Sequence, residues 1–158
     1  MAELKVRDLM TTQVITLKPN DSIKQATIRF AVNNISGAPV VDNRNHLVGI
    51  ISEDDVLQLI VKRQSEMDEG GGKMLSYSFD SKNQNTILQE AANDVSNTKV
   101  EEIMTRTLLT TTPDATIVDL LKAMIERKVK RVPVLEKGVL VGIISRGDIV
   151  FHIYKRKV

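Results

Sequence analysis

The stretch LVGIISEDDV, residues 47–56, decides the fold because the chain repeats it as LVGIISRGDI at residues 140–149. Both copies keep the glycine, the serine and the last aspartate. The surrounding sequence repeats as well. Residues 6–60 align with residues 100–153, shifted by 94 residues at first and by 93 after one residue is lost in a turn. A repeat this long exceeds a solenoid unit and indicates a duplicated supersecondary module.

The first half of each copy predicts a strand followed by a helix. Residues 13–17 and 107–111 are mostly β-branched or apolar, which predicts short strands. Capping-box spacing marks the start of each helix, in Ser22 with Gln25 and in Thr116 with Asp119. The apolar residues that follow recur at helical spacing. They predict one buried helical face in each copy, made of Ile23, Ala26 and Phe30 in the first and Ile117, Leu120, Leu121, Met124 and Ile125 in the second.

The second half of each copy predicts two strands and another helix. Strands are expected at residues 38–41 and 131–135, each with a proline that places it at a strand start or a sheet edge. The apolar runs at residues 47–51 and 140–144 are typical of strands covered on both faces. A helix then opens at each repeated serine, and its apolar face is expected to contain Val56, Leu57 and Ile60 in the first copy and Ile149, Val150 and Ile153 in the second.

Each copy is therefore a β-α-β-β-α unit, and the fold class is mixed α/β, of the α+β type. A module of this size buries only about 60% of its unfolded surface, so the two copies are expected to pack together. We predict repeat one at residues 1–61, a linker or insertion at residues 62–99, and repeat two with a basic C-terminal tail at residues 100–158. The polar linker has glycines at 70–72 and is expected to be partly flexible, although residues 86–95 have the spacing of a short helix.

Composition excludes several classes of function. The 158 residues contain no cysteine, which excludes disulfides, thiolate metal sites and thiol nucleophiles. The two histidines, His46 and His152, lie in unrelated contexts, so no metal site is expected. The apolar runs fall far short of the ~20 residues that span a bilayer, and the first residues lack a signal-peptide core, so we expect no membrane association and a cytoplasmic location. The net charge of +2 is too small to predict a nucleic-acid binder.

The repeated Ser-x-x-Asp corner has two compatible interpretations. Ser52 and Ser145 have the spacing to cap their helices, with Asp55 and Asp148 favoured by the positive end of the helix dipole. The same corner can offer a ligand a hydroxyl and a carboxylate, and a carboxylate accepts two hydrogen bonds, as the vicinal diol of a ribose requires. Spacing alone leaves both interpretations open.

A cluster of cations distinguishes the second copy. Arg127, Lys128, Lys130 and Arg131 lie where the first helix ends and the next strand begins, whereas the first copy has no cation there. Cations favour a helix C-terminus, which accounts for the first two residues better than for the last two. Four cations beside a pocket suit a phosphate. The chain has no glycine-rich phosphate loop of the Walker or dinucleotide type.

The ordered set of these motifs, present twice, resembles a tandem pair of cystathionine-beta-synthase (CBS) domains, a Bateman module. The carriers are VRDLMTTQVITLKPNDSI, GAPVVD and LVGIISEDDV, with VEEIMTRTLLTTTPDATI, RVPVLE and LVGIISRGDI as their counterparts. The resemblance implies two repeats packed about a pseudo-twofold axis, with two clefts between them that hold adenosine nucleotides. It also implies a homodimer, which agrees with the symmetry preference of oligomers.

In such modules each cleft draws residues from both repeats. Carried over, the resemblance implies a cleft one made of Ile50, Ser52, Asp55, Thr105, Thr107, Leu108, Lys128, Val129, Lys130, Arg131 and Val132. It implies a cleft two made of Thr11, Gln13, Val14, Ile35, Ser36, Gly37, Ala38, Ile143, Ser145 and Asp148. We predict that cleft one binds a phosphorylated nucleotide more tightly, because the cation cluster borders it and cleft two has only Arg146 close by. Glu53 and Asp54 also lie near cleft one.

No nucleophile–base pair, metal set or acid–base dyad can be assembled, so the sequence predicts a regulatory binding module and no enzyme. The expected ligand is AMP, ADP or ATP, with S-adenosylmethionine left open; no cofactor is required, and the regulated partner is an effector protein that the sequence does not identify. Two alternatives remain. One is nucleic-acid binding through the basic tail FHIYKRKV, with its interleaved Phe151 and Tyr154. The other is a structural adaptor with empty clefts.

Overall fold

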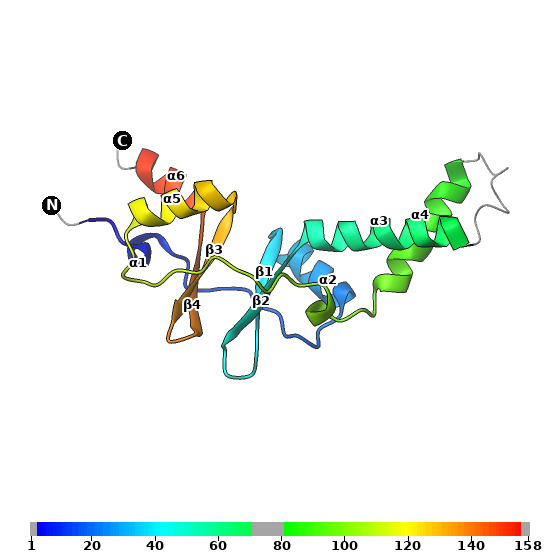
Figure 1. Ribbon diagram of the computed structural model, residues 1–158, viewed down its shortest axis with the longest axis horizontal. Coiled ribbons are helices and arrows are strands. Elements are labelled where there is room, and N and C mark those ends of the chain that lie inside the picture. Colours follow the sequence, from blue (N-terminus) through cyan, green and yellow to red (C-terminus); the bar gives the residue numbers. More distant parts are fainter. Residues whose placement is uncertain (1–2, 71–80, 156–158) are drawn as a thin grey trace.

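The computed structural model describes residues 3–70 and 81–155 of the chain. The mixed α/β class and the two repeats are confirmed (Figure 1). The first repeat contains α1 (Val6–Leu9), α2 (Ile23–Asn33), β1 (Gly37–Val41), β2 (Leu47–Ser52) and α3 (Glu53–Gly70). After α4 (Ser81–Val95), the second repeat contains η2 (Val100–Glu102), α5 (Ile117–Arg127), β3 (Arg131–Glu136), β4 (Val139–Ser145) and α6 (Arg146–Lys155).

Each repeat has one antiparallel hairpin at its centre. Strand β1 pairs with β2 from Gly37 opposite Ser52, and β3 pairs with β4 from Arg131 opposite Ser145. The registers match, so Gly37 and Arg131 are equivalent positions in the two repeats. The four strands predicted for the two hairpins begin and end within one residue of the observed ones.

The strands predicted at residues 13–17 and 107–111 are not regular strands. Each is reduced to one isolated parallel bridge, Leu17 with Val40 and Thr111 with Val134. The first bridge consists of Leu17 N–H donating to Pro39 O (3.0 Å) and Val41 N–H donating to Leu17 O (2.9 Å). A longer parallel ladder would next need the N–H of residue 39, which proline lacks. Proline thus stops the ladder from the middle of β1 rather than marking its start, and Pro133 does the same in β3.

The two repeats exchange their N-terminal segments. Val6 is buried in the core of repeat two, and Val100 with Met104 is buried in the core of repeat one. Backbone hydrogen bonds fix the exchange: Thr11 pairs with Ile143 (2.8 and 2.9 Å), and Ile50 pairs with Thr105 (3.0 and 2.8 Å). Because each core is completed by the other repeat, neither repeat holds a complete core of its own.

The exchange explains why both copies keep a glycine. A Cβ at Gly49 would lie 2.6 Å from Met104 Sδ and 3.0 Å from Thr105 O. A Cβ at Gly142 would lie 2.9 Å from Met10 Sδ and 3.0 Å from Thr11 O. In each repeat, the exchanged Met-Thr dipeptide of the other repeat crosses the strand at the glycine, where a side chain has no room.

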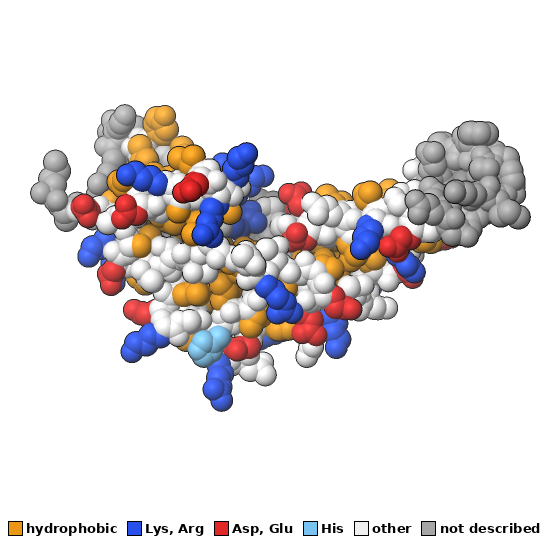
Figure 2. Space-filling view, viewed as in Figure 1, with side chains coloured by type: hydrophobic (Ala, Val, Ile, Leu, Met, Phe, Trp, Pro, Cys, Tyr) orange, Lys and Arg blue, Asp and Glu red, His pale blue; other side chains and the backbone are white. Residues whose placement is uncertain are grey.

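The helices bury only part of each predicted apolar face. In α2, Ile23, Ala26 and Phe30 are all buried as predicted. In α5, however, Ile125 is 71% exposed, and the prediction that it belongs to the buried face is wrong. The outer flanks of α3 and α6 are also open: Leu57, Val150 and Ile153 are all exposed. Apolar side chains consequently reach the surface over α3 at one end of the molecule and over α5 and α6 at the other (Figure 2).

Helices α3 and α4 run side by side and project from the sheets (Figure 1). The helix predicted at residues 86–95 is the last two-thirds of α4, and α3 continues past residue 61 to Gly70. The guanidinium of Arg63 on α3 pairs with Asp94 and with Glu66 (3.2 Å), which joins the helices and raises the pKa of Arg63. Glycines 71 and 72 lie outside the described residues. Within residues 3–70 and 81–155, no helix has the length and apolar character needed to cross a bilayer.

Candidate functional site

One cavity of about 460 Å³ lies between the repeats and collects most of the residues predicted for cleft one. Ten of the eleven line it, and the eleventh, Val132, is fully buried. Asp55 from repeat one and Arg131 from repeat two therefore face the same cavity. The lining residues beyond the predicted set are Ser36, Glu53, Asp54, Leu109 and Pro133. We keep the name cleft one for this cavity.

The acidic corner of cleft one is a preformed helix cap. Asp55 Oδ2 accepts hydrogen bonds from Ser52 N (2.8 Å) and Ser52 Oγ (3.1 Å), and Asp55 N–H donates to Ser52 Oγ (3.3 Å). This is the capping box predicted from the spacing. Both bonds to the carboxylate use Oδ2, so among the described residues Oδ1 has no hydrogen-bond partner. The capping interpretation is confirmed, and the cap leaves a carboxylate oxygen that can accept from a ligand.

The opposite wall of the cleft carries the cations. Lys128 is the C-cap of α5 in the left-handed conformation (φ 56°), and Lys130 and Arg131 follow at the start of β3. The equivalent C-cap in repeat one is Asn34 (φ 53°), a residue that tolerates this conformation far better than lysine. Arg127 ends α5 and is absent from the cavity lining. Three of the four clustered cations thus border the cleft. One of them, Lys128, has a left-handed backbone conformation that is unfavourable for a lysine.

Apolar residues close the rest of the cavity. Leu108, Leu109 and Val129 come from repeat two, and Ile50 comes from repeat one. The Ile50–Thr105 backbone pair described above lies at the point where the two repeats meet. Such walls suit a flat heterocycle, with polar groups at the two ends to fix its orientation.

Arg131 also reaches across to repeat one. Its Nη2 donates a hydrogen bond to Ser36 Oγ. A Cβ at Gly37 would collide with Nη1 of the same guanidinium. Ser36 and Gly37 were predicted for cleft two from the sequence, and the structure shows that Ser36 also lines cleft one.

The residues predicted for cleft two are placed in several ways. Thr11 and Ile143 pair through their backbones, and Ser145 and Asp148 form a capping box (2.9 and 3.1 Å) like that of repeat one. Ala38 is buried in the core. Ile35 and Ser36 line another cavity, between α2 and α3. The use of these residues, with Gln13, Val14 and Gly37, as a second ligand site remains a prediction.

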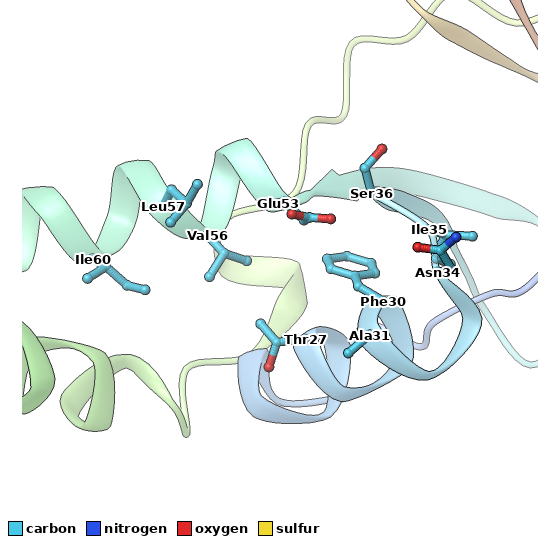
Figure 3. A pocket seen from close by; sticks show the side chains of 10 residues that line it. All are labelled: Thr27, Phe30, Ala31, Asn34, Ile35, Ser36, Glu53, Val56, Leu57 and Ile60. Atoms are coloured by element: carbon cyan, nitrogen blue, oxygen red, sulfur yellow. The ribbon is translucent and has the colours of Figure 1, made fainter. Parts of the chain in front are cut away.

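The cavity between α2 and α3, about 540 Å³, was not predicted from the sequence (Figure 3). Its floor includes Phe30, Val56 and Ile60, whose helical spacing indicated a buried face rather than a groove. Among its described lining residues, Glu53 is the one charged side chain, so this groove lacks the cations that a phosphate needs. The described residues contain no group of three acidic or histidine side chains placed to hold a metal ion.

Comparisons with known proteins agree with this architecture. The family model for the CBS domain matches residues 6–62 and 100–155. The uncharacterized protein MJ1426 of Methanocaldococcus jannaschii is 34% identical over 92% of this chain and 88% of its own length. A second protein of that organism, MJ1225, is 28% identical, and this chain spans 41% of it.

Solved structures give the same result. The crystal structure of the CBS-pair protein CBSX2 from Arabidopsis thaliana is 25% identical and has a TM-score of 0.76 over 99% of this chain and 98% of its own. CBSX2 in complex with AMP has a TM-score of 0.72 at 25% identity, over 98% of this chain and 99% of its own. With two matched copies of the domain in one chain, this protein belongs to the CBS-domain family.

Proposed function

We propose that this chain is a regulatory module that binds an adenosine nucleotide in cleft one and transmits its bound state to a partner protein. The observation that carries the proposal is the composition of a single cavity. It joins the carboxylate of Asp55, the cations Lys130 and Arg131, and apolar walls, and these groups come from both repeats. The binding of AMP by the structurally similar CBSX2 supports the choice of ligand.

Each part of the nucleotide has a matching group. The free carboxylate oxygen of Asp55 accepts from the ribose hydroxyls, and Ser52 adds a hydroxyl beside it. Lys130 and Arg131 bind the phosphate, with the planar guanidinium providing paired donors. Ile50, Leu108 and Val129 enclose the adenine. Thr105, Thr107 and Lys128 complete the lining from the predicted set.

The charge of the cavity ranks the ligands. AMP, ADP and ATP place anionic phosphate beside the three cations, whereas the sulfonium of S-adenosylmethionine would place a positive charge there. Glu53 and Asp54 on the facing wall limit the favourable field for a longer phosphate chain. We therefore expect AMP to bind more tightly than S-adenosylmethionine.

Transmission follows from where the cleft lies. A ligand that touches both repeats favours the relative arrangement in which its contacts to both are made, and it shifts the equilibrium by its difference in affinity between arrangements. The partner that responds is a separate protein or another part of a longer chain. MJ1225 is a relative with a longer chain, since this chain spans 41% of it.

We further propose a homodimer. Exposed apolar side chains lie on α2, α3, α5 and α6, among them Val32 (77% exposed) on α2 and Ile125 (71% exposed) on α5. A second copy is the partner whose helices present the same apolar faces, as a twofold interface requires. The other exposed members on these helices are Ile28, Leu57, Val61, Val118, Val150, Phe151, Ile153 and Tyr154.

Thermal unfolding tests the function. A ligand that binds only the folded chain raises Tm, by an amount that grows with its concentration relative to Kd. We expect AMP to raise Tm at millimolar concentration, and S-adenosylmethionine to raise it less. If AMP, ADP, ATP and S-adenosylmethionine all leave Tm unchanged, the chain is an adaptor with empty clefts. The nucleic-acid alternative depends on a tail whose residues 156–158 lie outside the described part of the chain.

A further inference from the structure

We propose that Ser36 and Gly37 of repeat one are positioning residues that hold the Arg131 guanidinium of repeat two at the phosphate end of cleft one. This inference rests on the proposed function and deepens it. Arg131 Nη2 donates to Ser36 Oγ across 95 residues of sequence, and both residues line the same cavity. Ser36 therefore contacts the group that binds the anion.

The absence of a side chain at Gly37 makes room for this arrangement. Gly37 and Arg131 are equivalent in the two hairpins, since each faces the serine that ends the second strand. The guanidinium of Arg131 fills the space that a Cβ on Gly37 would take. Two arginines at these positions would compete for one space and repel each other. These two equivalent positions therefore contribute one guanidinium instead of two, and that guanidinium lines cleft one.

Ser36 is itself fixed to the helix that carries the ribose site. Its carbonyl accepts from Glu53 N–H (2.8 Å), the first residue of α3, two residues before Asp55. The equivalent bond in repeat two joins Arg146 N–H to Lys130 O (2.9 Å). The α3 N-terminus thus sets the positions of both Asp55 and, through Ser36, the Arg131 side chain.

Positioning matters because a free arginine side chain has many rotamers, and each immobilised rotamer-rich side chain costs affinity on binding. Ser36 uses one of the five guanidinium donors and leaves four for a phosphate. Pre-ordering before the ligand arrives removes part of this cost, and the benefit appears only for ligands that carry a phosphate.

The test compares AMP with adenosine, both measured by competition against a fluorescent AMP analogue. Ser36→Ala should weaken AMP binding about three- to tenfold, because the cost of ordering one rotamer-rich side chain then falls on the binding step. It should change adenosine binding by less than about twofold, and Ser36→Thr, which keeps the hydroxyl, should bind AMP like the parent. In an Arg131→Ala background, Ser36→Ala should have no further effect, because the coupled partner is gone.

Ser96→Ala is the matched control, because the Ser96 hydroxyl donates to Ala92 O, outside the cleft (2.9 Å). It should leave both affinities unchanged. Equal losses of AMP and adenosine binding in Ser36→Ala would indicate a general structural role and overturn the inference. If the parent binds AMP and Ser36→Ala binds it with the same affinity, the inference is also overturned. The proposed function would remain intact in that case. A parent that binds neither compound overturns both proposals.

Discussion

The close crossing at Gly49 gives a quantitative test of the exchanged segments. In Gly49→Ala, the new Cβ would approach Met104 Sδ to 2.6 Å, Met104 Cγ to 2.8 Å and Thr105 O to 3.0 Å. The methionine can rotate, but Thr105 O is backbone and already accepts from Ile50 N–H (3.0 Å). The segment can therefore retreat only by stretching the Ile50–Thr105 pair, which links the two repeats.

Overpacking of this kind typically costs about 1–3 kcal/mol. For a chain of this length, about 1 kcal/mol lowers Tm by roughly 2–4 °C, so we expect a loss of about 2–12 °C. Gly142→Ala should behave similarly, since its Cβ would lie 2.9 Å from Met10 Sδ and 3.0 Å from Thr11 O. The assay is thermal unfolding followed by circular dichroism.

Gly147→Ala is the matched control. Its Cβ would have Ser145 Oγ as nearest neighbour at 3.6 Å, an ordinary contact. Because alanine is favoured over glycine in a helix by about 0.5–1 kcal/mol, this variant should melt at or above the parent Tm. Parent-like melting of Gly49→Ala and Gly142→Ala would refute the close crossing as the reason for the repeated glycine.

Three further predictions concern charge, backbone strain and assembly. The Arg7 guanidinium lowers the pKa of Asp114 from its ordinary 3.8 through a side-chain hydrogen bond and through its charge. The pair therefore stabilises the fold above pH 3.8, and this stabilisation is lost as the pH falls through the lowered pKa. Asp114→Asn should therefore reduce Tm at pH 7, and its difference from the parent should disappear in acid melts; a difference that persists there contradicts the pairing. Lys128→Gly should raise the free energy of unfolding by about 1 kcal/mol in urea, because glycine adopts φ 56° freely. It should also weaken AMP binding, because glycine lacks the cation. The control Asn34→Gly should leave AMP binding unchanged. Val32→Glu and Ile125→Glu should shift the mass measured by light scattering from dimer to monomer, with Ile15→Glu as a control outside the helices; a dimer that survives both changes excludes these faces.

Sequence alone predicted the elements that depend on local pattern. The hairpins, the capping boxes and the buried face of α2 follow from turn, cap and apolar spacing within one repeat. The hairpin strands were placed to within one residue because turn and cap residues flank them, as Ser52 and Ser145 do at the ends of β2 and β4. The strands predicted at residues 13–17 and 107–111 were wrong. A ladder with the first of these segments would need an N–H at Pro39, which lies in another segment of the chain, so the local pattern of residues 13–17 gives no sign of it.

Contacts between the repeats were harder to predict. Val6, Val100 and Ile125 are all apolar, but the sequence does not say that the first two cross to the other repeat and that the third remains exposed. The residue set of cleft one came from the family resemblance, and the structure brings that set together. The sequence could not reveal the direction of the Arg131 side chain, because the empty space at Gly37 that receives it exists only once the repeats are packed.

The most direct test of the central claim is calorimetric titration of AMP into the parent chain, Arg131→Ala, Asp55→Ala and Asp148→Ala. Asp55 and Asp148 cap equivalent helices, so the last two variants lose the same cap and differ in the cleft that they alter. We predict that the parent binds AMP, that Arg131→Ala and Asp55→Ala weaken the tightest binding at least about tenfold, and that Asp148→Ala leaves it within about twofold. Equal effects of Asp55→Ala and Asp148→Ala, or parent-like binding by Arg131→Ala, would contradict the assignment of the nucleotide to cleft one.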